Sequence, residues 1–98
     1  MARHDVYRLR QGELVVDCQS DIHRHLDTRF VIPAVPFDTD YPLKHGLNPV
    51  LDCAGDKIVL VAEFASTVFV RDIVETIGSV DAESDRVTRA LDFLTGGF

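Results

Sequence analysis

The apolar positions in the first third of the chain fall into short runs that alternate with turn residues. Val6–Arg10 and Glu13–Asp17 lie on either side of Gln11-Gly12, and such a two-residue spacing between apolar runs is typical of a β-hairpin. The run 30–32 predicts a third strand. We expect Pro33 to end that strand, because proline cannot donate a hydrogen bond to the ladder of a sheet.

The middle of the chain has the pattern of a loop followed by a second hairpin. Three of the four prolines and Gly46 fall in the stretch 34–49, which predicts a meandering surface loop. Beyond it, Pro49–Cys53 and Lys57–Val61 flank the turn residues 54–56, and this arrangement predicts two paired strands.

Phe64–Val70 continues the β-rich pattern, and the segment after it fits two kinds of element. Its apolar residues, at positions 70, 73, 74 and 77, have helical spacing, yet all are β-branched and also suit strands. We expect a strand or an extended segment there rather than a helix.

The clearest element is an amphipathic helix near the C-terminus. Asp81 or Ser84 can cap it, and acidic residues follow in its first turn. Arg86 and Arg89 are expected on the solvated side, together with two aspartates. Because glycine favours helix ends, we expect Gly96 to end the helix. The apolar stripe on the other side consists of Val87, Ala90, Leu91 and Leu94.

Several antiparallel strands followed by one helix predict a mainly β protein with one C-terminal α-helix. The architecture that fits is a small β-barrel that the helix closes or covers. The chain has 98 residues, which leaves room for one core, so we expect residues 1–98 to form a single domain.

Composition and charge narrow the choice of partners. The net charge is −6, and residues 49–98 carry nine acidic against four basic residues. Proteins that grip the phosphates of nucleic acid normally have the opposite charge, so direct nucleic-acid binding is disfavoured and a protein partner is favoured. The longest apolar run, Ile58–Ala62, is too short to span a membrane, and no secretory signal is visible. These features predict a cytoplasmic protein.

No group of residues indicates catalysis or a cofactor. His23 and His25 have H-x-H spacing between two aspartates, but two imidazoles make an incomplete metal site and the segment is typical of a polar loop. Cys18 and Cys53 lie in apolar surroundings and are expected to be reduced and buried. Nothing places a histidine beside Cys18, and there is no glycine-rich phosphate loop. We therefore expect no enzyme activity, no cofactor and no metal.

The stretch VDCQSDI (Val16–Ile22) ends a predicted strand with side chains that can bond the backbone in a turn. It is followed by RFVIP (Arg29–Pro33), preceded by DVYRLR, and accompanied by EFAS (Glu63–Ser66) further along. Together these motifs resemble the CcdB family, the toxins of the ccd toxin–antitoxin system. The resemblance spans essentially the whole chain, and only the middle, about residues 34–48, matches poorly.

The resemblance implies a homodimeric toxin with an SH3-like barrel, a fold that MazF-like toxins share. CcdB binds the A subunit of DNA gyrase and traps the enzyme on cleaved DNA, which serves plasmid maintenance. A CcdA antitoxin neutralises it with a disordered tail that folds on binding. The partners that the resemblance predicts are therefore a second copy of the chain, a CcdA-like antitoxin and the gyrase A subunit.

The resemblance also assigns a role to the C-terminal tail. Members of the family poison gyrase with a final tripeptide of tryptophan, glycine and a hydrophobic residue, and this chain ends in Gly96, Gly97 and Phe98. Gly97 and Phe98 match and are the predicted gyrase-binding residues, whereas glycine replaces the tryptophan. Two alternatives stay open: a MazF-like endoribonuclease on the same fold, and a non-toxic relative that keeps only dimer and antitoxin binding.

Overall fold

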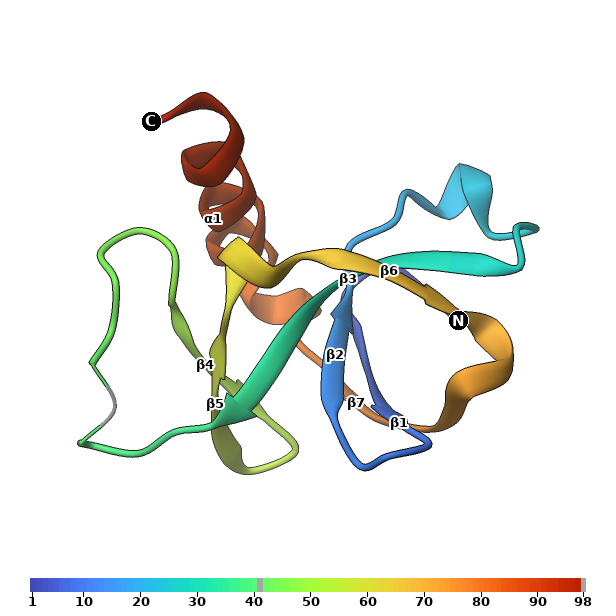
Figure 1. The fold of residues 1–98 in the computed structure, drawn as a ribbon, viewed down its shortest axis with the longest axis horizontal. Coiled ribbons are helices and arrows are strands. Elements are labelled where there is room, and N and C mark those ends of the chain that lie inside the picture. Colours follow the sequence, from blue (N-terminus) through green and yellow to red (C-terminus); the bar gives the residue numbers. More distant parts are fainter. Residues whose placement is uncertain (41, 98) are drawn as a thin grey trace.

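The computed structural model describes residues 1–40 and 42–97 (Figure 1). These residues contain seven strands and one α-helix, joined by 3-10 turns and loops. The predicted mainly β fold with one C-terminal helix is confirmed. The strands are β1 (Asp5–Leu9), β2 (Leu14–Asp17), β3 (Thr28–Pro36), β4 (Val50–Cys53), β5 (Asp56–Leu60), β6 (Ser66–Phe69) and β7 (Ile73–Ser79). The helices are the 3-10 turns η1 (Asp21–His23), η2 (Ala62–Phe64), η3 (Val70–Asp72) and η4 (Asp81–Glu83), and the α-helix α1 (Ser84–Gly96).

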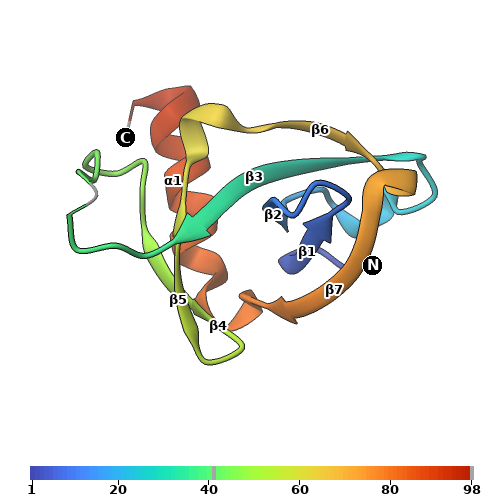
Figure 2. The ribbon, with the colours of Figure 1, turned by 60° about the horizontal axis from the view of Figure 1, so that its bottom comes forward.

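The strands form one curled sheet in the order β4-β5-β3-β2-β1-β7, with β6 paired to β3 outside this path. The long strand β3 pairs with β2 on one side. On its other side it pairs with β6 along its first half and with β5 along its second half. This change of partner curls the sheet into the predicted small barrel, and α1 lies at the end of the barrel where β5 runs (Figure 2).

β1 and β2 form the predicted first hairpin, with Val6 opposite Val16. The turn is one residue longer than expected. The Leu9 N–H donates to the Glu13 carbonyl at 2.8 Å, so the loop consists of residues 10–12. Three-residue loops of this kind are a common alternative to the two-residue hairpin turn, and the spacing of apolar runs does not separate the two.

The expectation that Pro33 ends a strand is wrong, because β3 continues to Pro36. Pro33 lies where β3 exchanges β6 for β5 as its neighbour, between Val31 and Ala34. Its carbonyl accepts the Val61 N–H at 2.9 Å on this side. The N–H and C=O of a strand residue point the same way, so the missing N–H of Pro33 faces the break between β6 and β5. The sheet loses no ladder bond there and tolerates the proline.

The other strand predictions are confirmed with small shifts. β4 and β5 form the second hairpin, and its turn is Ala54-Gly55 alone, since residue 56 already belongs to β5. The segment 70–77 is the turn η3 followed by β7, as its β-branched residues favour. The predicted loop 34–49 is shorter than expected, because β3 occupies its first residues.

The C-terminal helix is confirmed, but both of its ends differ from the prediction. Asp81 begins the 3-10 turn η4 rather than α1, and Ser79 Oγ accepts its N–H at 3.1 Å. Ser84 is the first helical residue of α1 and not its cap. Gly96 is the last helical residue, and Gly97, with a φ of +77°, is the residue that ends the helix. A pair of adjacent glycines marks a helix end without showing which of the two terminates it.

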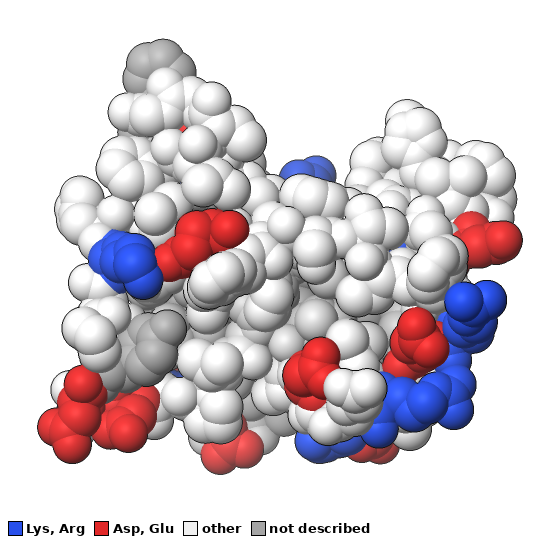
Figure 3. Space-filling view, viewed as in Figure 1, with Lys and Arg blue, Asp and Glu red and all other residues white. Residues whose placement is uncertain are grey.

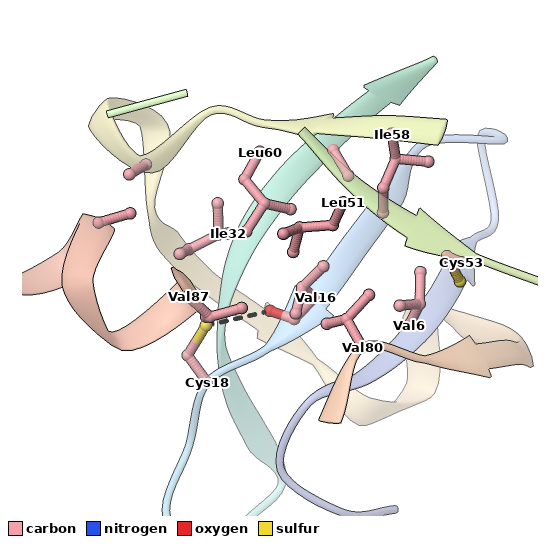
Figure 4. Close-up of a cluster of buried hydrophobic side chains, with 13 residues drawn as sticks. Val6, Val16, Cys18, Ile32, Leu51, Cys53, Ile58, Leu60, Val80 and Val87 are labelled. Atoms are coloured by element: carbon pink, nitrogen blue, oxygen red, sulfur yellow. Dashed lines mark hydrogen bonds between the residues drawn. The ribbon is translucent and has the colours of Figure 1, made fainter. Parts of the chain in front are cut away.

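Buried side chains from the strands and α1 fill the barrel. Val87 and Ala90 of α1 pack into the larger cluster, where Val87 lies beside Ile32 of β3 (Figure 4). Cys18 and Cys53 belong to the same cluster as free, buried thiols, as predicted. None of the helices in the described part of the chain is long and apolar enough to cross a membrane.

Candidate functional site

The end of α1, which carries the predicted target-binding residues, projects from the barrel (Figure 1). The Gly97 N–H donates to the Phe93 carbonyl at 3.0 Å, and the left-handed φ of Gly97 turns the chain off the helix axis. A side-chain carbon at Gly97 would meet no atom within 4 Å, so the φ and not a lack of space requires glycine. Phe98, the other predicted site residue, lies outside the described residues.

A groove runs between α1 and the loop 43–49, with a volume of about 620 Å³. Gly46 comes so close to Phe93 that a side-chain carbon there would lie 2.5 Å from the ring. His45 meets the same ring edge-on, with 6.1 Å between the ring centroids. We call this feature the α1 groove. Its described lining residues include Lys44, His45, Asn48, Arg86, Arg89 and Phe93.

Hydrogen bonds of the Asn48 side chain hold the loop that forms one wall of the α1 groove. Asn48 Oδ1 accepts the Lys44 N–H at 2.9 Å, and Asn48 Nδ2 donates to the Leu60 carbonyl at 3.2 Å and to Glu63 Oε1 at 2.8 Å. Lys44 Nζ lies 3.0 Å from Glu63 Oε2. Burial alone would raise the pKa of Glu63, but hydrogen bonds from the backbone, Lys44 and Asn48 outweigh it and lower that pKa. The wall is therefore formed before any ligand binds.

Arg86 and Arg89 are exposed, as predicted, and they also line the α1 groove. Arg86 Nη1 donates to the Val50 carbonyl at 2.5 Å and lies 3.2 Å from Glu83 Oε1. No ion pair forms at Arg89 within the part of the chain that the structure describes. The spacing 86, 89, 90, 93 places these residues on one helix face, but the mixture of charged and apolar types hid that pattern.

Exposed apolar side chains gather along β6 and the adjoining half of β3. Phe30 and Phe69 are both exposed, and the register of β3 and β6 puts their rings diagonally opposite on one face. Leu26 lines a hollow with Phe69, and the Arg71 guanidinium stacks 4.5 Å above the Phe69 ring. Among the described residues β6 pairs only with β3, so its other edge is open. We call Leu26, Phe30 and Phe69 the β6 surface.

A buried ion pair, which the sequence did not reveal, lies within the barrel. Arg29 Nη2 is 2.7 Å from Asp17 Oδ2, Arg29 Nε donates to the same oxygen at 2.8 Å, and both side chains are fully buried. The Tyr7 hydroxyl also donates to Asp17 Oδ2. Burial, and after it this hydrogen bond, raises the pKa of Tyr7 above its ordinary value. Arg29 is thus held inside the protein and does not reach a ligand at the surface.

The turn predicted for VDCQSDI is confirmed, and Gln19 organises it. Gln19 Nε2 donates to the carbonyls of His23 and Thr28, both at 3.0 Å, and its Oε1 accepts the Phe30 N–H at 2.9 Å. These bonds fasten η1 and the loop after it to β3. The motif that carries the family resemblance therefore shapes the backbone beside the β6 surface.

The groups considered for chemistry are placed as follows. His23 lies in η1 and His25 in the loop after it, so the two do not share a strand. Within residues 1–40 and 42–97 no group of three or more metal-binding side chains comes together. Burial, with the Asp17 charge as a second cause, raises the pKa of the Cys18 thiol to about 12. This thiol stays protonated at neutral pH and is a poor nucleophile.

On the face seen in Figure 3, basic and acidic groups lie close together at the lower right, around η3 and the β1–β2 turn. Here Arg8 Nε lies 2.8 Å from Glu75 Oε1, and Arg10 Nε lies 3.8 Å from Asp72 Oδ1. The cations in this region are therefore largely neutralised by their neighbours. In the α1 groove Lys44 and Arg86 are likewise paired, with Glu63 and Glu83, whereas Arg89 forms no ion pair within the described part of the chain.

Three solved structures resemble the chain in fold. An endoribonuclease from a mycobacterial species matches with a TM-score of 0.82 and 14% identity over 98% of this chain and 91% of that chain. The Mycobacterium tuberculosis toxin MazF-mt6 matches with a TM-score of 0.72 and 15% identity over 90% of this chain and 92% of that one. A protein described as an Mtb toxin matches with a TM-score of 0.71 and 16% identity over 88% and 94% of the two chains. At these identities the likeness shows a shared fold.

The sequence as a whole matches one family. No similar sequence is found among the curated proteins. The family model described as CcdB protein matches residues 3–97, a range that includes the VDCQSDI motif, the buried ion pair and Gly97. The chain therefore belongs to the CcdB family of toxins.

Proposed function

We propose that this toxin poisons DNA gyrase by binding its A subunit with the C-terminal tail, Gly97 and Phe98. The observation that carries the proposal is the match to the CcdB family over residues 3–97. The geometry at Gly97 supports it, because Gly97 is exposed and ends α1 with a left-handed φ. Phe98 is then the apolar anchor that enters the target.

The proposed action is inhibition by binding, with no chemistry in the toxin itself. A ligand that binds one state of an enzyme more tightly than the others shifts the enzyme toward that state. A toxin that prefers gyrase with cleaved DNA therefore delays resealing, while gyrase performs the cleavage. The protonated Cys18 and the internally paired Arg29 agree with this, since neither offers a reactive group at the surface.

Because glycine stands at position 96, we expect this toxin to bind gyrase more weakly than family members that have tryptophan there. Gly96 occupies the place of the family's tryptophan, lies at the last helical position and is exposed. A tryptophan at an interface often contributes about 2 kcal/mol or more, so its absence weakens binding by roughly thirtyfold. We propose that the toxin keeps a weaker form of the family's activity, with Phe98 as the remaining aromatic contact.

We further propose that the toxin acts as a homodimer joined through the β6 surface. An open strand edge beside exposed aromatic side chains favours pairing with another chain. Two-fold symmetry brings identical patches together, so Phe30 and Phe69 of one copy meet the same residues of the other. This contact also removes the apolar rings from water.

The family implies an antitoxin partner, and we propose that it is CcdA-like, with a disordered tail that orders on the toxin. Coupled folding and binding lets a short segment cover a large surface and leaves it open to proteolysis when free. Such an antitoxin neutralises the toxin by covering the surfaces that gyrase needs.

The second candidate function is a MazF-like endoribonuclease, which the likeness to a mycobacterial endoribonuclease over 98% of the chain favours. RNA cleavage needs cations and an acid–base pair that the substrate can reach. The net charge of −6 and the burial of Arg29 argue against it. A non-toxic relative that retains dimer and antitoxin binding is the third candidate.

Expression in growing cells separates these candidates. The gyrase proposal predicts growth arrest that a co-expressed CcdA-like antitoxin relieves, together with an induced DNA-damage response and intact messenger RNA. Fragmented messenger RNA without DNA damage would show the ribonuclease instead. Normal growth at high expression would show the non-toxic relative. A variant that lacks residues 97–98 is the control, because it is expected to keep the barrel and lose the arrest.

A further inference from the structure

The outer edge of β4 is a place where another strand could add to the sheet. Among the described residues β4 lies at one end of the strand order and pairs only with β5. The Pro49 carbonyl accepts the Leu60 N–H at 3.0 Å, so the backbone at position 49 faces β5. Backbone groups alternate in direction along an antiparallel strand, so the N–H and C=O groups of Val50 and Asp52 face the outer edge. A row of such groups is a template for pairing with another chain.

Two side chains at the start of α1 bond to this edge. Glu83 Oε2 accepts the Asp52 N–H at 2.9 Å, and Arg86 Nη1 donates to the Val50 carbonyl at 2.5 Å. Glu83 Oε1 and Arg86 Nη1 lie 3.2 Å apart, so the two side chains also hold each other in place. The carboxylate accepts where the carbonyl of a neighbouring strand would, and the guanidinium donates where its N–H would. We call Glu83 and Arg86 the β4 latch.

The positions of the two latch residues are not explained by the needs of α1. Glu83 is the N-cap residue, but its side chain makes no capping hydrogen bond within the described chain, and glutamate is not among the preferred caps. Arg86 lies in the first turn of α1, where the helix dipole disfavours a cation. Both side chains instead bond to the backbone of β4, so the strand edge and not the helix accounts for them.

An edge without the latch fits a second copy of the same chain. Two β4 strands can pair antiparallel about a two-fold axis at Leu51, which places Val50 of each copy opposite Asp52 of the other. All outward backbone groups of the two residues then find partners, and no like charges lie opposite each other. The Val50 carbonyl and the Asp52 N–H are needed for this pairing, and the latch occupies both. We propose that the β4 latch prevents a second copy of the chain from adding its β4 to the sheet.

The proposal goes beyond gyrase binding and does not rest on it. It also concerns a different contact from the β6 surface. Two different two-fold contacts on one chain can join copies into open-ended assemblies. The latch therefore leaves one strand edge unavailable and limits how large an assembly the chain forms.

The first test removes the latch with the double variant Glu83→Ala/Arg86→Ala. Sedimentation velocity over a series of concentrations is expected to show species larger than those of the wild-type protein, which grow with concentration. The matched control is Glu75→Ala/Arg8→Ala, which removes an exposed ion pair of 2.8 Å that joins two side chains. We expect the control to sediment as the wild type does. Circular dichroism checks that both double variants keep the fold.

A third substitution shows whether the new contact uses the edge of β4. Asp52→Pro, added to the latch variant, removes an outward N–H, and proline is tolerated in an edge strand where its missing N–H would face away from the sheet. We expect this triple variant to return to the size of the wild-type protein. Association that persists in the triple variant would place the contact elsewhere and overturn the proposal. So would a folded latch variant that sediments as the wild type does, or an equal increase in size in the control.

Hydrogen exchange tests the latch without any association. In Glu83→Ala the Asp52 amide is expected to exchange roughly tenfold faster than in the wild-type protein, because it loses a hydrogen bond to a charged group. The Ile58 amide, in the ladder between β4 and β5, is expected to keep its rate. An unchanged rate at Asp52 would show that the latch does not hold this edge, and would overturn the proposal. None of these measurements involves gyrase, so failure here and failure of the gyrase proposal are distinguishable.

Discussion

Asp17 and Arg29 are fully buried, although charged side chains are rarely placed in a protein interior. Each neutralises the other, and the Tyr7 hydroxyl supplies a further hydrogen bond to Asp17. Such a pair adds little net stability compared with apolar residues of the same shape, but the loss of one partner leaves the other charge buried and uncompensated. The pair therefore acts as a constraint on which strands may meet, since it joins β2 to β3.

The first prediction concerns this ion pair. Asp17→Asn is expected to lower the free energy of unfolding by about 3–5 kcal/mol, because Arg29 then stays buried without a counter-charge. Glu75→Gln is the control, since it breaks the exposed pair with Arg8 and is expected to cost less than about 1 kcal/mol. Urea unfolding followed by circular dichroism measures both. A similar small loss in the two variants would contradict the buried pair.

The second prediction concerns the Cys18 thiol, whose pKa burial raises from 9.0 to about 12. Between about pH 9 and 12 the unfolded chain releases this proton while the folded chain keeps it, so stability falls as the pH rises. Below about pH 9 the contribution is fully present. Tyr7 and Cys53, also with raised pKa values, add to the same trend. We expect a shallower fall in Cys18→Ala, measured by urea unfolding at a series of pH values; an unchanged slope would show that Cys18 does not carry this shift.

At the scale of elements, α1 performs three tasks with different faces. Val87 and Ala90 close the core, Arg89 and Phe93 line the α1 groove, and its last turn carries Gly97. Because α1 is anchored in the core, it holds Gly97 in a fixed position relative to the barrel. That rigidity favours binding, because less conformational freedom is lost on contact with a target.

The third prediction separates the roles of the two glycines. Gly96→Ala is expected to raise the free energy of unfolding by about 0.5 kcal/mol, because Gly96 is helical and alanine is the better helix former. Gly97→Ala is expected to lower it by about 1 kcal/mol, because alanine is strained at a left-handed φ. Thermal unfolding of the two variants measures the signs. Reversed signs would place the helix end at Gly96, as the sequence pattern alone suggested.

For the whole molecule, the sequence predicted the classes of element well and their boundaries less well. Apolar periodicity and β-branched residues identified the strands and the helix because these signals are local. The passage of β3 through Pro33 depends on a change of neighbouring strand, which no local signal reports. The Asp17–Arg29 pair and the α1 groove, with Lys44 and Arg89 on opposite walls, likewise bring together residues far apart in sequence. The candidate tail came from family resemblance and not from periodicity.

The fourth prediction concerns assembly. Phe69→Glu is expected to convert the proposed homodimer into a monomer, because it places a charge in the β6 surface. Val74→Glu is the control: Val74 is equally an exposed apolar residue in a strand, but it lies on β7. Sedimentation velocity of the three proteins measures the oligomeric state. A monomeric wild-type protein, or dimers in both variants, would contradict the proposed interface.

Gyrase poisoning by the tail is the central claim, and a cleavage assay with purified gyrase, supercoiled plasmid and ATP tests it most directly. Linear DNA released by detergent and protease reports the trapped complex. We predict that the wild-type toxin produces linear DNA and that Gly96→Trp does so at roughly thirtyfold lower concentration, since it restores an aromatic contact of about 2 kcal/mol. The absence of linear DNA with both proteins, at concentrations where their fold is intact, would contradict the account.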